Sequence, residues 1–186
     1  MDKIVSAAEL ESNDRVLEIG PGKGALTERL LNSKASLVHA IEVDRDLISG
    51  LRNRFSPQSR FSLIEGNVLS VPLIAEDGGS FTKVVANIPY NITGPILERL
   101  VGRLGKPSET IYRRLVILLQ KEVADRILAS PGSSNFSALS VRFQLLAKSR
   151  SICLVPPKCF RPAPKVYSKV ILIDPFKQED RIDSHI

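Results

Sequence analysis

The chain has 186 residues, of which 43% are hydrophobic and 25% are charged, with a formal net charge of +6. A chain of this length typically forms one domain with a full hydrophobic core, and no apolar run approaches the ~20 residues needed to cross a bilayer. The two cysteines, Cys153 and Cys159, have no histidine nearby and fit no zinc site. We therefore expect reduced thiols in a cytoplasmic protein, without a metal ion or a membrane contact.

Positive charge is concentrated in the second half of the chain. Residues 1–100 carry 11 basic and 13 acidic side chains, a net charge of −2, whereas residues 101–186 carry 15 and 7, a net charge of +8. Such an excess favours a polyanionic partner held against the C-terminal half. A basic surface that is merely solvated is the alternative interpretation.

In chain order, strand patterns alternate with helix patterns, and Asp44 is expected to cap one of the helices. This alternation predicts an α/β fold with a mostly parallel sheet and helices on both faces. Ligands in such folds bind beyond the carboxyl ends of the strands. We expect strands at 15–19, 36–42, 61–65, 81–86, 115–119, 151–155 and 166–173, the last two pairing antiparallel, and helices at 4–10, 26–31, 44–54, from about 93, 121–129 and 136–147.

The turn after the first strand reads EIGPGKG, from Glu18 to Gly24. Gly20 and Gly22 permit positive φ and let a ligand approach the backbone closely. The stretch also fits a dinucleotide fingerprint, so an NAD-type cofactor is one interpretation. However, the acid Glu18 would repel a pyrophosphate and suits the ammonium group of a methionine moiety. The turn therefore favours S-adenosylmethionine (SAM) over NAD.

Polar side chains also follow the second and third strands. Glu42 ends the second strand about 20 residues after the glycines, where an acid accepts hydrogen bonds from ribose hydroxyls. For Asp44 we prefer the role of a helix cap. Asn67 follows the third strand, where its amide either binds the adenine of the cofactor or forms a turn. The sequence leaves these two interpretations of Asn67 open.

The fourth strand ends in Asn87-Ile88-Pro89-Tyr90, which resembles the motif of amino-group methyltransferases. The exocyclic amine of adenine is a poor nucleophile because its lone pair is delocalised into the ring. We expect the Asn87 side-chain oxygen and the Ile88 carbonyl to accept its two hydrogens, while Pro89 fixes the backbone and Tyr90 stacks on the base. Such catalysis depends on positioning and electrostatics, without an obligatory general base. The alternative is a strand-terminating turn with a core tyrosine.

Residues 155–166 form a stiff, basic and proline-rich segment before the last strand. Phe160 offers a second face for the target base, and Lys158, Arg161 and Lys165 are candidates for contact with RNA phosphates. The alternative is a rigid crossover in which Phe160 fills the core.

Five segments together resemble the KsgA family of small-subunit rRNA adenine-N6,N6-dimethyltransferases: VLEIGPGKGALTERLL, IEVDRDL, NIPYNITGPIL, LQKEVADRI and VPPKCFRPAPKV. The resemblance implies a Rossmann-like class I methyltransferase fold, whose mostly parallel seven-stranded sheet has an antiparallel strand near the C-terminus. It implies that SAM donates methyl groups to N6 of two adjacent adenosines near the 3′ end of the rRNA, in ribosome biogenesis. It places Glu18, Gly20, Gly22, Glu42, Asn67 and Asn87 around the cofactor, and Asn87, Ile88, Pro89, Tyr90 and Phe160 around the target base.

The resemblance also implies a domain division and a partner. Residues 1–174 are expected to form the catalytic domain, and the polar tail 175–186 to lead to a helical C-terminal domain. The implied partner is small-subunit rRNA within a pre-ribosomal particle, bound by a monomer. The family usually has aspartate at the position of Asn67. The alternatives are a non-catalytic RNA-binding assembly factor, or the same chemistry on large-subunit rRNA, DNA adenine or a glutamine side chain.

Overall fold

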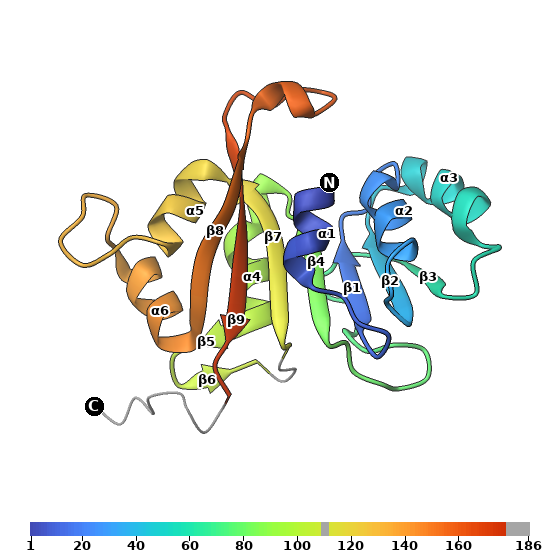
Figure 1. Cartoon of the computed structure of the whole chain (residues 1–186), viewed down its shortest axis with the longest axis horizontal. Coiled ribbons are helices and arrows are strands. Elements are labelled where there is room, and N and C mark those ends of the chain that lie inside the picture. Colours follow the sequence, from blue (N-terminus) through green and yellow to red (C-terminus); the bar gives the residue numbers. More distant parts are fainter. Residues whose placement is uncertain (109–111, 178–186) are drawn as a thin grey trace.

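The structure is a computed structural model that describes residues 1–108 and 112–177 (Figure 1). Its centre is one seven-stranded sheet. The strands of this sheet are β1 (Arg15–Ile19), β2 (Leu37–Glu42), β3 (Phe61–Glu65), β4 (Lys83–Asn87), β7 (Arg114–Gln120), β8 (Ala147–Val155) and β9 (Ser168–Pro175). They lie in the order β3-β2-β1-β4-β7-β9-β8, and β9 runs antiparallel to both of its neighbours. The predicted mostly parallel sheet with an antiparallel strand near the C-terminus is confirmed.

Helices cover both faces of the sheet. The α-helices are α1 (Asp2–Ala8), α2 (Ala25–Leu31), α3 (Arg45–Phe55), α4 (Thr93–Val101), α5 (Lys121–Ile127) and α6 (Ala138–Leu146). Two short 3₁₀-helices, η1 (Tyr90–Ile92) and η2 (Pro157–Cys159), follow β4 and β8. In the described ranges, no helix has the length and apolar character that a membrane span requires.

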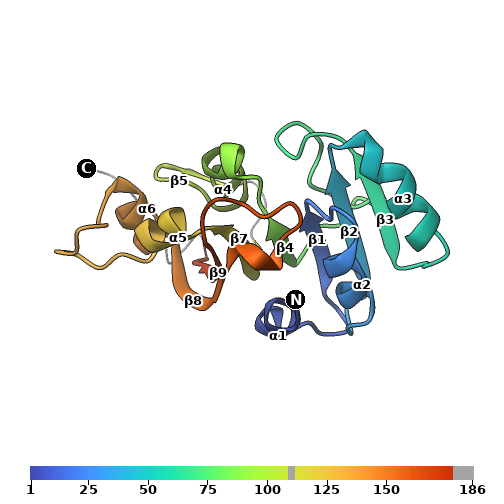
Figure 2. The same cartoon turned by 90° about the horizontal axis from the view of Figure 1, so that it is seen from above.

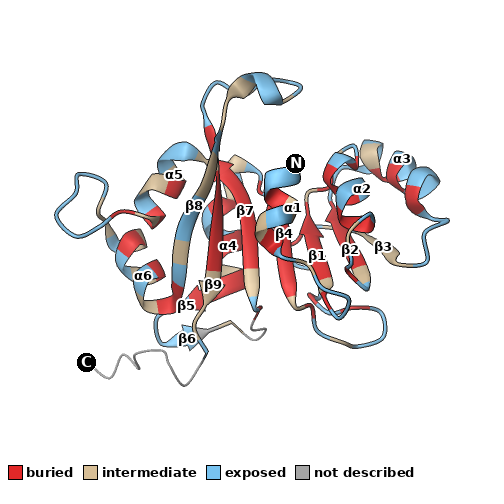
Figure 3. Ribbon diagram, viewed as in Figure 1, coloured by how far each residue is buried: buried red, intermediate tan, exposed pale blue. Residues whose placement is uncertain are grey.

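Each face of the sheet has its own hydrophobic core. One core joins the sheet to α1, α2 and α3, and the other joins it to α4, α5 and α6. Consecutive residues of a strand point to opposite faces, so Val16 of β1 lies in the first core and Leu17 in the second. Figure 3 shows buried residues running along the central strands, while the outer faces of the helices are exposed. Burial on both faces explains the continuous apolar runs in the sequence.

The structure differs from the sequence predictions mainly on the C-terminal side. β8 begins at Ala147, where a helix was expected to end, because the strand pairs with β9 from Ala147 opposite Pro175. β9 begins at Ser168 rather than at residue 166 and extends to Pro175, into the predicted polar tail; residues 178–186 of that tail lie outside the described residues. A small hairpin of β5 (Gly102–Arg103) and β6 (Lys106–Pro107) was not predicted. In each case strand pairing overrides the local sequence preference.

Candidate active site

The predicted motifs meet at one edge of the sheet. β1, β2, β3, β4 and β7 are parallel, so their carboxyl ends lie at the same edge, which is the upper edge in Figure 1. The connection between β8 and β9, residues 156–167, rises above this edge. Seen from above, it extends from β8 and β9 toward β4 (Figure 2). The glycine turn, Glu42, Asn67, the Asn87–Tyr90 motif and the basic segment therefore belong to one side of the molecule.

The glycine turn after β1 lies against the end of β4. Gly20 has φ +70°, and a Cβ on it would stand 2.7 Å from the backbone carbonyl oxygen of Asn87. That separation is too short for a side chain, so Gly20 makes room for the Asn87 motif, a role that sequence analysis did not foresee. Gly22 has φ +59°, and a Cβ there would meet nothing within 4 Å. The space beside Gly22 is therefore open to a ligand.

Glu18 is fully buried near the end of β1, as is Thr27 of α2. Burial raises the pKa of Glu18 to about 8; the nearby Thr27 partly offsets this rise, and the charge of Glu42 adds to it. The Thr27 hydroxyl does not reach hydrogen-bond geometry, so neither it nor either Glu18 oxygen has a hydrogen-bond partner among the described residues. Buried polar groups are nearly always paired. These orphaned groups beside an open glycine turn indicate a polar ligand that completes them.

Glu42 connects the first and second turns. Its Oε2 accepts the Gly22 N–H at 3.1 Å, and its Oε1 accepts the N–H groups of Val43 and Asp44 at 2.9 and 3.0 Å. A carboxylate has about four acceptor positions, so one position on Oε2 remains for a ribose hydroxyl. Asp44 caps α3 and accepts the Asp46 N–H at 3.0 Å, which confirms its interpretation as a helix cap.

Asn67 forms the turn after β3. Its Oδ1 accepts the Leu69 N–H at 2.9 Å, so the turn interpretation is realised in the structure. Its side chain is nevertheless exposed at the candidate site. Sequence analysis missed Val43, which is 64% exposed between Glu42 and Asp44 and offers an apolar face to an aromatic ring. The signal in the sequence that could have identified Val43 was an apolar residue between two acids at a strand end.

The backbone of the Asn87 motif is firmly held. The Ile88 N–H donates to the Leu118 carbonyl on β7 at 3.1 Å, and the Ile88 side chain is buried. Pro89 has φ −57° and ψ 132°, and its carbonyl accepts the Thr93 hydroxyl at 3.2 Å. Asn87 itself is exposed as the last residue of β4. A polar side chain thus stands on a fixed backbone at the open edge.

Tyr90 is half-buried and is held by a hydrogen bond to the start of β9. Its hydroxyl forms a hydrogen bond of 2.7 Å with Oγ of Ser168, a fully buried residue that begins β9. Sequence analysis missed Ser168, because the contact joins residues 78 positions apart and depends on how β9 pairs with β7. The bond fixes the ring while part of it stays exposed.

Phe160, the predicted second face for the target base, lies on the connection between β8 and β9. Phe160 is half-buried and packs against the core beneath α1, α2 and α3, as the core-filling interpretation expects. The aromatic ring contacts in the described residues are His39–Phe81 and Phe55–Phe61. Lys158, Arg161 and Lys165 are exposed on the same connection. The basic face of the site is therefore present, and the role of Phe160 toward the target base stays a prediction.

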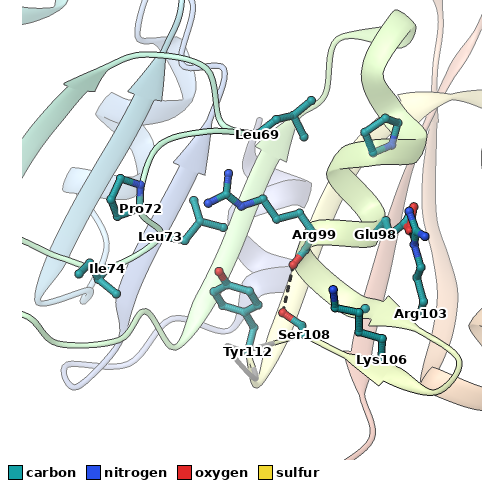
Figure 4. A pocket seen from close by; sticks show the side chains of 12 residues that line it. Leu69, Pro72, Leu73, Ile74, Glu98, Arg99, Arg103, Lys106, Ser108 and Tyr112 are labelled. Atoms are coloured by element: carbon teal, nitrogen blue, oxygen red, sulfur yellow. Dashed lines mark hydrogen bonds and ion pairs between the residues drawn. The ribbon is translucent and has the colours of Figure 1, made fainter.

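A cavity of about 790 Å³ lies away from this edge, beside the end of α4 and the β5–β6 hairpin (Figure 4). The Arg99 guanidinium donates to the carbonyls of Val68 and Val71 at 2.5 and 2.6 Å, and the Arg99 carbonyl accepts the Ser108 hydroxyl at 3.0 Å. Among the described residues that line it, none is a predicted site residue. These contacts hold α4 against the β3–β4 connection.

The sequence and fold match known proteins. The sequence model of a family described as "Ribosomal RNA adenine dimethylase" matches residues 1–184. Ribosomal RNA small subunit methyltransferase A of Prochlorococcus marinus (strain MIT 9211) is 65% identical over 186 residues, which is all of this chain and 66% of the relative. The same-named protein of Synechococcus sp. (strain WH7803) is 63% identical over 98% of this chain and 65% of its own length. The chain thus spans about two thirds of the length of these relatives.

Two solved structures share the fold. A dimethyladenosine transferase from Plasmodium falciparum superposes with a TM-score of 0.85 and 34% identity, covering 96% of this chain and 62% of that one. The 23S rRNA methyltransferase ErmE superposes with a TM-score of 0.76 and 28% identity, covering 94% of this chain and 66% of that one. The architecture is the Rossmann-like fold of methyltransferases.

Proposed function

Because the chain belongs to the ribosomal RNA adenine dimethylase family, we propose that it catalyses SAM-dependent methylation of N6 of two adjacent adenosines near the 3′ end of small-subunit rRNA. The relatives named for the small subunit support this choice of substrate. The observation that carries the proposal is the exposed Asn87 at the end of β4, whose backbone carbonyl lies against Gly20 of the glycine turn. This contact brings an amine-binding motif and a cofactor turn into one site.

The residues of the first three turns fit SAM. Glu18 and Thr27, both buried without a hydrogen-bond partner in the described part of the chain, would hold the methionine ammonium group. Glu42 would accept ribose hydroxyls, and Val43 and Asn67 would flank the adenine. When bound there, SAM supplies a methyl group already activated by its sulfonium, so the proposal needs no metal ion.

The target amine would be held by the Asn87 motif. The Asn87 side-chain oxygen and the Ile88 carbonyl would each accept one hydrogen of the amine, which localises the nitrogen lone pair. The hydrogen bond between Ile88 and Leu118 and the fixed φ of Pro89 set these acceptors in place before the substrate arrives. Tyr90, held by Ser168, would stack on the adenine.

The rRNA backbone would contact the exposed Lys158, Arg161 and Lys165 above the site. The excess of positive charge in residues 101–186 supports a polyanionic substrate. We therefore place residues 1–174 as the catalytic domain of a monomeric, cytoplasmic protein that acts on a pre-ribosomal particle, without membrane or metal.

The test is the Asn87→Ala variant of the full-length protein that contains this chain. Small-subunit particles lacking the methyl groups are incubated with labelled SAM, and methyl transfer is measured in single turnover. We expect the rate to fall by ~10²-fold or more, the scale for losing one preorganised polar group, and SAM affinity to stay within a few-fold. Asn91→Ala, an exposed asparagine in η1, is the matched control and should methylate like the parent.

Three other outcomes would redirect the proposal. An Asn87→Ala protein that methylates at the parental rate would remove the motif from catalysis. A parent protein that binds the particle without transferring methyl groups would favour the assembly factor. Transfer to large-subunit rRNA in place of the small-subunit particle would favour the other rRNA substrate, on which the ErmE neighbour acts.

A further inference from the structure

A second hollow lies beside the target motif. It is a cavity of about 510 Å³ between the end of β7, the start of α5 and the segment that precedes β9. Its volume falls within the range of pockets that bind small molecules or single building blocks of polymers. Gln120, Asn135, Lys165 and Tyr167 line it. Of these four residues, the proposed mechanism uses only Lys165.

The cavity and the target motif share the start of β9. Ser168, which holds the Tyr90 hydroxyl, directly follows Tyr167, and the Tyr167 carbonyl accepts the Lys121 N–H at 2.9 Å. Side chains of successive residues in an extended chain point to opposite sides, and their Cα atoms are about 3.8 Å apart. Ser168, which holds the Tyr90 hydroxyl, and Tyr167, which lines the cavity, are therefore neighbours whose side chains point to opposite sides of the chain.

The lining offers what a nucleobase requires. Tyr167 is 48% exposed where it lines the cavity. An exposed aromatic ring in a hollow is a stacking surface for a base. The side-chain amides of Gln120 and Asn135 each carry donors and an acceptor, which match the polar edge of a base.

Two basic and two acidic side chains line the cavity: Lys121, Lys165, Glu122 and Asp125. Asp125 pairs with Lys121 at 2.5 Å and also with Lys169, so these cations are already engaged. Lys165 is exposed and forms no ion pair among residues 1–108 and 112–177. Because the exposed acid Glu122 also lines the cavity, its acids and bases balance, and Lys165 offers a single phosphate contact rather than a basic path for a longer stretch of backbone.

We propose that this cavity is a second nucleotide subsite, in which Tyr167 stacks on the base next to the target adenosine and Lys165 contacts its phosphate. The inference rests on the proposed function, since it requires an RNA strand in the site. Holding the neighbouring base apart would unstack the target adenine and leave its amine free for Asn87. The subsite would thereby determine which nucleotide of the RNA strand reaches Asn87.

A double-mutant cycle tests the subsite. The full-length parent and Tyr167→Ala bind short single-stranded RNAs that contain the target adenosine, either intact or with an abasic nucleotide on its 5′ or its 3′ side. We expect Tyr167→Ala to weaken binding of intact RNA by about 10-fold, the fold-change that ~1.4 kcal/mol of stacking gives. One of the two abasic RNAs should bind the parent and the variant equally.

The controls separate stacking from other effects. Tyr167→Phe keeps the ring and should bind like the parent, and Val141→Ala alters an exposed apolar residue on α6 and should change nothing. Lys165→Ala should weaken all three RNAs alike, because each keeps the phosphate. Equal losses for Tyr167→Ala on intact and on both abasic RNAs, or no loss at all, would overturn the subsite. Binding is measured without methyl transfer, so this failure is distinct from failure of the Asn87 test.

Discussion

Asp14 and Glu18 lie four residues apart, and both carboxyl groups are fully buried, yet their surroundings are opposite. Asp14 precedes β1 at the amino edge of the sheet and contacts Lys83 at 2.8 Å, Arg113 at 2.6 Å and the Thr82 hydroxyl at 2.7 Å. Glu18, near the carboxyl edge, has no hydrogen-bond partner among the described residues. The same short segment thus contains one carboxyl group that the fold satisfies and one without a partner in the described residues, which the proposed function assigns to the cofactor.

The pKa values of Asp14 and Glu18 shift in opposite directions because of these different surroundings. Burial by itself raises the pKa of both groups. At Asp14, hydrogen bonds from Lys83, Thr82 and the Glu11 N–H outweigh burial, and the pKa is lowered. At Glu18 burial prevails, and the pKa rises to about 8. Asp14 therefore contributes stability in its ionised form, whereas ionisation of Glu18 costs stability, as we expect of a group kept for a ligand.

Removing the charge of Asp14 should have the largest effect on stability. Asp14→Asn would leave the Lys83 ammonium, which is itself buried, without its counter-ion. We expect a loss of about 3–5 kcal/mol in the free energy of unfolding, the scale for breaking a buried ion pair. Denaturant unfolding at pH 7 measures it.

Asp77→Asn is the matched control, because it breaks the ion pair of an exposed aspartate with Arg15. Exposed pairs contribute little to stability, so this variant should lose much less stability than Asp14→Asn. Equal stability of Asp14→Asn and Asp77→Asn would contradict the contrast between the two edges.

Glu18→Gln should act in the opposite direction. The pKa of Glu18 is about 8 in the folded protein and near 4.5 when unfolded, so the unfolded chain releases the proton first. Stability of the parent should therefore fall as the pH rises from about 4.5 to about 8 and then level off. Glu18→Gln removes this slope and should stabilise the protein by roughly 1–3 kcal/mol at pH 7. The free energies of unfolding of the parent and of Glu18→Gln at pH 5, 7 and 8 measure the pH dependence and the stabilisation.

The same variant should bind SAM more weakly, by about 10-fold or more, because a charged acceptor for an ammonium group is lost. Gain of stability with loss of binding identifies a ligand group rather than a structural one. Glu28→Gln changes an exposed acid on α2 that pairs with Arg54 and should move neither quantity. A Glu18→Gln protein with parental SAM affinity would separate Glu18 from the cofactor.

The strands and the helix cap near the candidate site were predicted well from the sequence. β1 and β3 begin and end as expected, because each is a short apolar or alternating run bounded by polar and turn residues. The cap at Asp44 is local chemistry and was also predicted. The contact of Tyr90 with Ser168 and that of Asp14 with Thr82 join residues 78 and 68 positions apart. Such contacts depend on strand order and register, which local patterns do not contain.

The smallest expected effect concerns Asn67. Its two interpretations, as a ligand of the adenine and as a turn residue, predict different SAM affinities for a variant. The Oδ1 atom already accepts the Leu69 N–H, and the side chain is exposed. Asn67→Asp would keep that turn with one oxygen and offer a second, charged oxygen to the adenine amine of SAM. A charged acceptor strengthens a hydrogen bond by roughly 1 kcal/mol, so calorimetry should show about 5-fold tighter binding. Asn67→Ser keeps a turn-forming hydroxyl and should not tighten it. An Asn67→Asp protein with unchanged SAM affinity would restrict this residue to the turn and leave the adenine to Val43.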